Sequence, residues 1–308
     1  MIRIAVVGDV HDQWQAADAE ALRHLRVDLV LFVGDFGNES LEVVRQVAAL
    51  PWPKAVVLGN HDAWYTATDW GRRKCPYDRQ QEDRLHAQLE LLSDLHVGYA
   101  RREFPDLDVT VVGGRPCSWG GSEWKLGDFY HQYFGVNGWD DSQARITQAI
   151  RQAQSQQVIL LNHNGPAGLG TEPDAPCGRD WAPVGGDYGD PDLQAALTVT
   201  RREGVRIPLV VFGHMHRQLR GNLGQRRMWS RDEQGTVYFN AAVVPRLRPV
   251  GNSTLHHFGR VELGKNGVET LAQVWVHPQL GVVETEWLIQ APFMGRPPAW
   301  ENPHPIGA

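Results

Sequence analysis

Five short segments of the chain each present aspartate, asparagine or histidine directly after an apolar run. They are Gly8-Asp9-Val10-His11, Gly34-Asp35-Phe36-Gly37-Asn38, Gly59-Asn60-His61-Asp62, Asn162-His163-Asn164-Gly165-Pro166 and Gly213-His214-Met215-His216. The runs before them are rich in β-branched residues and predict buried strands. Because ligands bind beyond the carboxyl ends of the strands in open α/β sheets, the five segments predict one convergent site.

The residue types in these segments suit the binding of divalent metal ions. Side chains two residues apart in an extended chain point the same way, so Asp9 and His11 can bind one ion from the same side. His214 and His216 have the same spacing. Carboxylates together with imidazoles favour Mn, Fe or Zn. The full set of candidate ligands is Asp9, His11, Asp35, Asn60, His163, His214 and His216.

These candidate ligands are more than one tetrahedral zinc ion needs. They suit two metal ions that share a bridging carboxylate. Two ions about 3.5–4 Å apart can clamp a phosphoryl group and activate a bridging water for attack. The pattern therefore favours phosphoryl chemistry with two divalent ions, for which we expect Mn, with Fe or Zn as the alternatives.

The first three segments need neighbouring parallel strands to bring them together. A glycine begins each of them at a nearly constant interval, and apolar residues spaced three and four apart predict helices over residues 13–25 and 39–50. This alternation of strand and helix predicts parallel strands with right-handed crossovers. Asp9, Asp35 and Asn60 would then emerge side by side at one edge of the sheet.

Periodicity predicts further elements in the rest of the chain. Helices are expected over residues 80–92, 141–154 and 190–203, the last with Asp190 as N-cap and Pro191 as first residue, and strands over 109–114, 237–240, 253–261 and 271–276. The strands after His216 have an antiparallel character. We expect them to form a second sheet that packs on the first.

We expect a single domain over residues 1–290, with insertions at about 63–107, 115–139 and 164–191. The last insertion has no periodicity and begins beside His163, and loops of that length inside a domain are usually functional. We expect it to act as a lid or substrate loop. Within it, Arg179 is a candidate substrate contact, because a guanidinium group binds phosphate with two hydrogen bonds. The Pro-rich stretch 291–308 is expected to be a surface tail.

The composition excludes several classes of function. The 308 residues include 36 acidic and 30 basic side chains, a net charge of −6, so no overall basic character points to nucleic acid or to an anionic membrane. Three scattered cysteines do not predict a disulfide framework and fit a cytoplasmic location. We see no secretion leader, and no apolar run approaches the ~20 residues that span a bilayer. The sequence does not indicate the oligomeric state.

Taken in order, the blocks G-D-V-H, G-D-F-G-N, G-N-H-D, N-H-N-G-P and G-H-M-H resemble the five-block signature of the calcineurin-like metallophosphoesterases. The blocks span residues 8 to 216, and the whole chain more loosely resembles a cyanobacterial and plastid branch of that superfamily. The resemblance implies an α/β fold of four layers, αββα. Two mixed β-sheets would pack as a sandwich flanked by helices, with a dinuclear metal site at the sheet edge.

The resemblance also implies a role for each candidate residue. Asp9, His11 and His216 would bind the first metal ion, and Asn60, His163 and His214 the second, with Asp35 bridging both. His61 would donate a proton to the leaving group, and Asp62 would orient it. This assignment is chemically reasonable, because an alkoxide leaving group needs a proton and a neighbouring carboxylate raises the protonated fraction of an imidazole.

The sequence departs from one branch of the superfamily. Protein serine/threonine phosphatases carry G-D-x-x-D-R-G and G-N-H-E, whereas Asn38, Glu39 and Ser40 follow Gly37 here and Asp62 replaces the glutamate. The phosphate-binding arginine of that block is therefore absent. We expect instead a hydrolase that uses a metal-bridging hydroxide to cleave a phosphomonoester or phosphodiester, with a small phosphorylated metabolite or a nucleotide as substrate. The alternative is a scaffold that has the fold but no turnover, or a metal-binding regulator.

Overall fold

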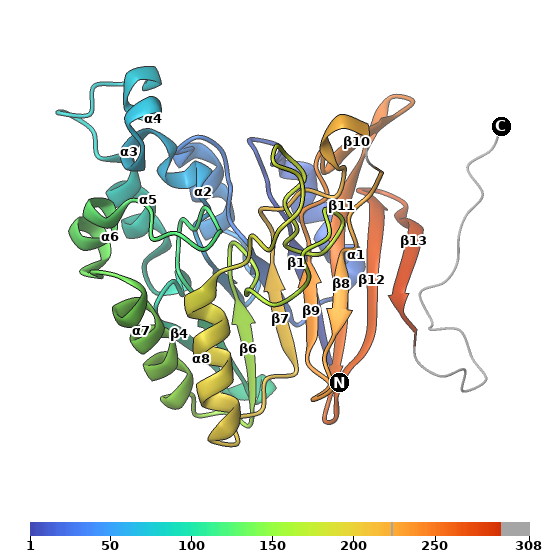
Figure 1. Cartoon of the computed structure of the whole chain (residues 1–308). Helices are drawn as coiled ribbons and strands as arrows, with labels where there is room; N and C mark the ends of the chain where they lie inside the picture. Colours follow the sequence, from blue (N-terminus) through green and yellow to red (C-terminus); the bar gives the residue numbers. More distant parts are fainter. Residues whose placement is uncertain (223, 291–308) are drawn as a thin grey trace.

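The first apolar runs form the parallel half of one sheet. β1 (Ile2–Val7), β2 (Leu29–Phe32) and β3 (Lys54–Val56) pair in parallel in that order, and α1 (Ala16–Leu25) and α2 (Leu41–Ala48) connect them. The predicted alternation of strand and helix is confirmed, although both helices begin later than predicted. The structure is a computed structural model and describes residues 1–222 and 224–290 (Figure 1).

Two of the three strands predicted to form a second sheet, 253–261 and 271–276, extend this same sheet instead, so the prediction is wrong for them. The third, 237–240, lies in the second sheet, but it pairs there in parallel with a neighbour and not only antiparallel as expected. β11 (Ser253–Gly264) pairs antiparallel with β1, and Ile4 lies opposite Val261. β12 (Gly267–His277) and β13 (Gly281–Ile289) continue outward, and β10 (Leu247–Val250) pairs with β11. A strand with one unpaired edge exposes a row of N–H and C=O groups. On the outer edge of β1, β11 provides the hydrogen-bond partners for these groups.

The second sheet is built from the middle of the chain, in the order β4-β5-β6-β7-β9-β8. Its strands are β4 (Arg101–Phe104), β5 (Val109–Gly113), β6 (Gln157–Leu161), β7 (Leu209–Phe212), β8 (Trp229–Arg231) and β9 (Val237–Asn240). The central strands β5, β6, β7 and β9 run parallel, and β4 and β8 are antiparallel to their neighbours. Both sheets are therefore mixed.

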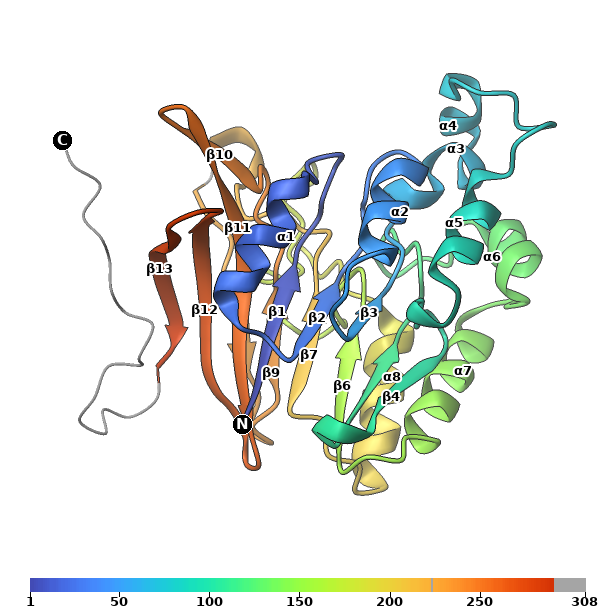
Figure 2. The ribbon, with the colours of Figure 1, turned by 180° about the vertical axis from the view of Figure 1, so that it is seen from behind.

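Alternation along the strands sorts the buried side chains into layers. Ile4 and Ile159 belong to one apolar cluster between the sheets. Ala5 belongs to a second cluster under α1 and α2, and Leu160 joins Leu197 of α8 (Pro191–Arg202) in a third. Figure 2 shows α1 and α2 over the first sheet, and Figure 1 shows α7 (Trp139–Arg151) and α8 (Pro191–Arg202) over the second. Burial of apolar surface on both faces of each sheet produces the four layers that the resemblance implied.

The other α-helices lie in the first two predicted insertions. They are α3 (Trp64–Ala67), α4 (Asp69–Lys74), α5 (Arg84–Leu92) and α6 (Gly127–Phe134). α8 begins with Asp190 as N-cap and Pro191 in its first turn, as predicted. The Pro-rich stretch 291–308 lies outside the described residues. None of the helices in residues 1–222 and 224–290 is long and apolar enough to cross a membrane.

Candidate metal centre

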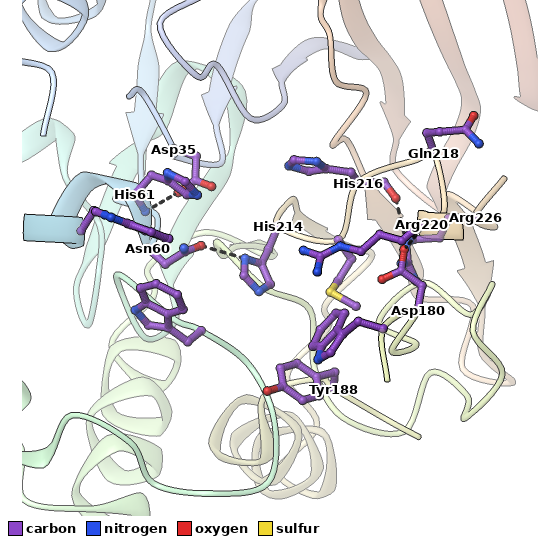
Figure 3. A pocket seen from close by; sticks show the side chains of 14 residues that line it. Asp35, Asn60, His61, Asp180, Tyr188, His214, His216, Gln218, Arg220 and Arg226 are labelled. Carbon is purple, nitrogen blue, oxygen red and sulfur yellow. Dashed lines mark hydrogen bonds and ion pairs between the residues drawn. The ribbon is translucent and has the colours of Figure 1, made fainter. Parts of the chain in front are cut away.

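The five polar segments meet at one end of the two sheets. Asp9, Asp35 and Asn60 follow strands of the first sheet, and His163 and His214 follow β6 and β7 of the second. Figure 3 shows Asp35, Asn60 and His214 around the same hollow. The structure thus brings together residues from segments that are more than 200 positions apart in the chain.

The glycines of these segments leave room for the side chains of the site. A Cβ atom on Gly59 would lie 2.3 Å from Asp35 Oδ1 and 2.6 Å from His163 Cε1. On Gly213 it would lie 2.1 Å from Asp9 Oδ1. Such separations are too short for real atoms, so a larger residue would displace a candidate ligand. Glycine is therefore a steric requirement of the site at both positions.

One group of donors consists of Asp9, His11 and His216. His216 Nε2 lies 3.3 Å from Asp9 Oδ2, and His11 Nε2 lies 3.1 Å from His216 Nε2. The backbone N–H of His214 donates to the Asp9 carboxylate, with 3.1 Å to each oxygen, and holds it in place. The donor atoms converge closely enough to bind one ion.

A second group consists of Asn60, His163 and His214. Asn60 Oδ1 lies 2.8 Å from His163 Nε2 and 2.8 Å from His214 Nδ1. The other ring nitrogen of His163, Nδ1, lies 2.8 Å from the carbonyl oxygen of Val33 and donates to it. His163 Nε2 then carries the lone pair that a metal ligand needs.

Asp35 lies between the two groups. Its Oδ1 is 3.4 Å from His163 Nε2, and its Oδ2 is 3.7 Å from His11 Nε2. The backbone N–H of His61 donates to Asp35 Oδ1 at 2.8 Å. This placement fits the bridging role that the resemblance implied. The binding of two metal ions there stays a prediction.

The charges of the site fit divalent cations. Asp9 and Asp35 are buried. Burial, together with the nearby carboxylates of Asp9 and Asp62, raises the pKa of Asp35 well above its usual range. Burial also lowers the pKa of His163 and of His214, which favours the neutral imidazoles that can bind a metal ion. Buried carboxylates beside neutral imidazoles form a donor set that bound divalent ions would stabilise.

His61 also lies at this site, but its partner differs from the expected one. Its Nδ1 lies 2.7 Å from Asn38 Oδ1. The carboxylate of Asp62 is engaged elsewhere, because it accepts from the backbone N–H groups of Phe36 at 2.8 Å and Gly59 at 2.7 Å. The expectation that Asp62 orients His61 is therefore wrong. Asn38 holds the ring, and the buried Asp62 holds the turn that carries it.

The protonation of His61 also differs from expectation. Burial, together with the neighbouring His11 and His163, lowers the pKa of His61 to about 3. With Asn38 Oδ1 accepting from Nδ1, the neutral ring carries its lone pair on Nε2. The carboxylate of Asp9 raises this pKa, but burial lowers it more, so the protonated form that the sequence analysis expected is not favoured.

A cavity of about 310 Å³ opens beside these side chains. Several of its lining residues were not predicted to lie at the site, among them Trp64, Trp119, Trp181, Tyr188 and Arg220. Arg179, the predicted substrate contact, is not among the lining residues, and its Nε donates to the carbonyl of Gly185 at 2.9 Å. The one signal for the aromatic residues was the high count of twelve tryptophans, which packing alone would also explain.

The four-layer fold and its paired donor groups are those expected of a metallophosphoesterase. A model of the calcineurin-like phosphoesterase family matches residues 2–218. The match covers more than half of the 308 residues, so the chain belongs to the calcineurin-like phosphoesterase family. No curated protein sequence matches the chain.

Several solved structures are similar to the chain at low sequence identity. TT1561 of Thermus thermophilus is 12% identical, with a TM-score of 0.47, and the match covers 87% of this chain and 97% of that one. A metallophosphoesterase from Sphaerobacter thermophilus is 16% identical, with a TM-score of 0.34 and coverage of 85% and 83%. A novel archaeal phosphodiesterase is 12% identical, with a TM-score of 0.39 and coverage of 89% and 100%.

Proposed function

We propose that this protein is a metal-dependent phosphoesterase that hydrolyses a phosphomonoester or phosphodiester of a small molecule, either a phosphorylated metabolite or a nucleotide. The observation that supports this most is the position of Asp35 between two groups of donors beside an open cavity. A purely structural cluster of buried carboxylates would have no reason to border a cavity. The cytoplasmic location stays a prediction.

We propose two divalent ions as cofactors, with Mn as the expected pair and Fe or Zn as the alternatives. Asp9, His11 and His216 would hold one ion, and Asn60, His163 and His214 the other, with Asp35 shared. When bound, such ions supply Lewis-acid chemistry, since they withdraw charge from phosphate and make water a better nucleophile. The cavity residues supply the remaining contacts.

His61 is proposed as the proton donor to the leaving oxygen. Its ring borders the cavity, and Asn38 fixes its Nδ1 so that Nε2 is free for a reacting group. The pKa of about 3 favours the neutral ring. The negative charge of a bound phosphate ester raises this pKa, so that Nε2 takes up a proton from water and can then donate it to the leaving oxygen.

Arg220 is proposed as the guanidinium that binds the phosphate, in place of Arg179. Its side chain is exposed, lines the cavity and makes no ion pair within residues 1–222 and 224–290. Figure 3 shows Arg220 across the hollow from His61. A planar guanidinium in that position can form two parallel hydrogen bonds to phosphate oxygens.

Hydrolysis of para-nitrophenyl phosphate and of its bis-ester tests this function. The wild-type protein is assayed after chelation and again after addition of Mn, together with Asp35→Asn and with Asp128→Asn, a matched change at an exposed carboxylate. We expect turnover only with metal, with loss in Asp35→Asn and retention in Asp128→Asn. The ratio of monoester to diester turnover assigns the substrate class. Two bound ions without turnover of either ester would favour the scaffold or regulator.

A further inference from the structure

Four aromatic rings line the cavity beside the candidate metal centre: Trp64, Trp119, Trp181 and Tyr188. Each keeps part of its surface exposed, unlike the fully buried Tyr130 of the core. Because tryptophan is large and rarely buried completely, the feature that distinguishes these rings is that all four border one cavity. Partly exposed rings gathered in a concave site are typical of a ligand pocket.

The rings form two walls. Trp64 and Trp119 form the first wall, with ring centroids 5.1 Å apart, and Trp64 stacks in turn on His61 with centroids 4.4 Å apart. Trp181 and Tyr188 form the second wall, with centroids 4.7 Å apart and planes at 79°. Because the first wall begins at His61, a group bound along it lies next to the proposed leaving oxygen.

The two walls are held together although they lie in different insertions. The backbone N–H of Gly121, two residues after Trp119, donates to the carbonyl of Tyr188 at 2.9 Å. Asn164 Nδ2 donates to the same carbonyl, also at 2.9 Å. A Cβ atom on Gly121 would lie 3.2 Å from the Tyr188 ring, so this turn packs directly against the second wall. Walls that are already in place bind a rigid ring at little cost in conformational entropy.

A positive charge accompanies the second wall. The guanidinium carbon of Arg220 lies 5.2 Å from the ring centroid of Trp181. Figure 3 shows Arg220 and Tyr188 on the same side of the hollow, with His214 between them and His61. The cavity therefore offers aromatic surface and a cation side by side, which suits a ligand that carries a ring and an anionic group.

We propose that the substrate carries a flat aromatic group, such as a nucleobase or a phenyl ring, which binds between the wall of Trp64 and Trp119 and the wall of Trp181 and Tyr188. The inference rests on the proposed function for the phosphate ester that the ring accompanies. Stacking on aromatic side chains tolerates many rings, because every such ring has a π-face. The walls thus select a flat aromatic shape over a saturated one.

Two matched pairs of ligands test the inference in the metal-free wild-type chain, where calorimetry measures binding without hydrolysis. AMP and ribose 5-phosphate share the phosphate ester and differ in the base. Phenyl phosphate and cyclohexyl phosphate have six-membered rings, one flat and one puckered. We expect the aromatic member of at least one pair to bind about tenfold tighter, the scale of one stacked ring. The pair that responds identifies a base or a smaller ring. Equal binding within both pairs, or no binding of AMP and phenyl phosphate at millimolar ligand, overturns the inference.

Variants of the wall residues test whether these rings cause the preference for aromatic ligands. Trp181→Leu should weaken the preference within the responding pair severalfold, because one of the two walls loses a ring, whereas Trp181→Phe, which keeps a ring, should retain most of it. Trp70→Leu is the control, since Trp70 touches Trp64 with centroids 5.5 Å apart but does not line the cavity. If Trp181→Leu keeps the full preference in a folded protein, the ring binds elsewhere and the inference is wrong.

The outcome is separable from that of the proposed function. A preference for aromatic ligands without ester hydrolysis would support the aromatic pocket and contradict the proposed enzymatic function. Hydrolysis with equal binding within both ligand pairs would support the enzymatic function and contradict the aromatic pocket. The difference in affinity within a pair reports on the walls alone, because the donor groups contribute equally to the binding of both members.

Discussion

The metal centre and the aromatic walls border the same cavity but are built in different ways. In the centre, every donor side chain contacts another donor or a backbone group, as the buried His163 does with Asn60 and Val33. In the walls, the rings are partly exposed and come from long insertions, as Trp119 and Tyr188 do. The contrast indicates that the chemistry depends on short turns at strand ends, whereas the choice of substrate depends on how separate loops meet.

The largest expected effect comes from breaking the centre without touching a ligand. Gly59→Ala places a Cβ atom 2.3 Å from Asp35 Oδ1, so the carboxylate must move. We expect metal affinity to fall about 10–100-fold, as for changes in residues that support ligands, with turnover falling at least as much. Metal analysis and para-nitrophenyl phosphate kinetics measure both. The matched control is Gly138→Ala, where an added Cβ meets nothing within 4 Å. Full metal occupancy in Gly59→Ala would contradict the steric explanation.

A second prediction separates proton donation from metal chemistry within the centre. Replacing His61 removes the proposed proton donor, so His61→Asn should slow the hydrolysis of phenyl phosphate about 10²-fold. Para-nitrophenyl phosphate should be affected much less, because its leaving group needs no proton. Asn38→Ala should act in the same direction but more weakly, since Asn38 only holds His61 Nδ1. An equal loss on both esters would show that His61 does not act as an acid.

A third prediction tests the cation of the wall. Arg220→Ala should raise KM about tenfold with little change in kcat, because one charge-assisted contact to phosphate is lost. Arg179→Ala is the comparison, since its Nε donates to Gly185 within its own loop and its side chain does not line the cavity. Steady-state kinetics with para-nitrophenyl phosphate measure both variants. A larger KM effect in Arg179→Ala would return the phosphate contact to the residue predicted from the sequence.

The smallest expected effect concerns a histidine outside both regions. Burial, together with the charges of Arg246, Arg217 and Arg248, lowers the pKa of His257 to about 3. The unfolded chain binds a proton near pH 6.5, so stability is full above that pH and falls as pH drops from about 6.5 toward 3. By pH 5.5 the loss from this group is about 1 kcal/mol.

His257→Phe should remove this contribution. Urea unfolding of wild type and variant between pH 7 and pH 5 measures it, and the difference between the two free energies of unfolding should change with pH in favour of the variant as pH falls. Parallel pH profiles would mean that His257 takes up no extra proton on unfolding. Other groups affect both proteins alike, so the difference isolates this one residue.

Much of the fold near the site could be predicted from local pattern. The parallel order of β1, β2 and β3 follows from alternating strands and helices, and Asp190 and Pro191 mark the start of α8 as expected. The partner of β1 on its other edge could not be predicted. The sequence pattern of an antiparallel strand does not identify its partner. The pattern of β11 therefore fitted a separate sheet as well as it fitted the first sheet, which β11 in fact joins.

The sequence by itself determined the donors of this protein, because each lies within a few residues of a strand end and its type is visible in the motif. It also determined the glycines, whose missing side chains make room for neighbouring donors. Only the tertiary structure decided that Asn38, and not Asp62, holds His61. Only the tertiary structure brought Trp119 and Tyr188 together, through a hydrogen bond between two insertions. The physical reason is range: a turn at a strand end is specified by adjacent residues, whereas contacts between loops depend on the packing of every element that carries them.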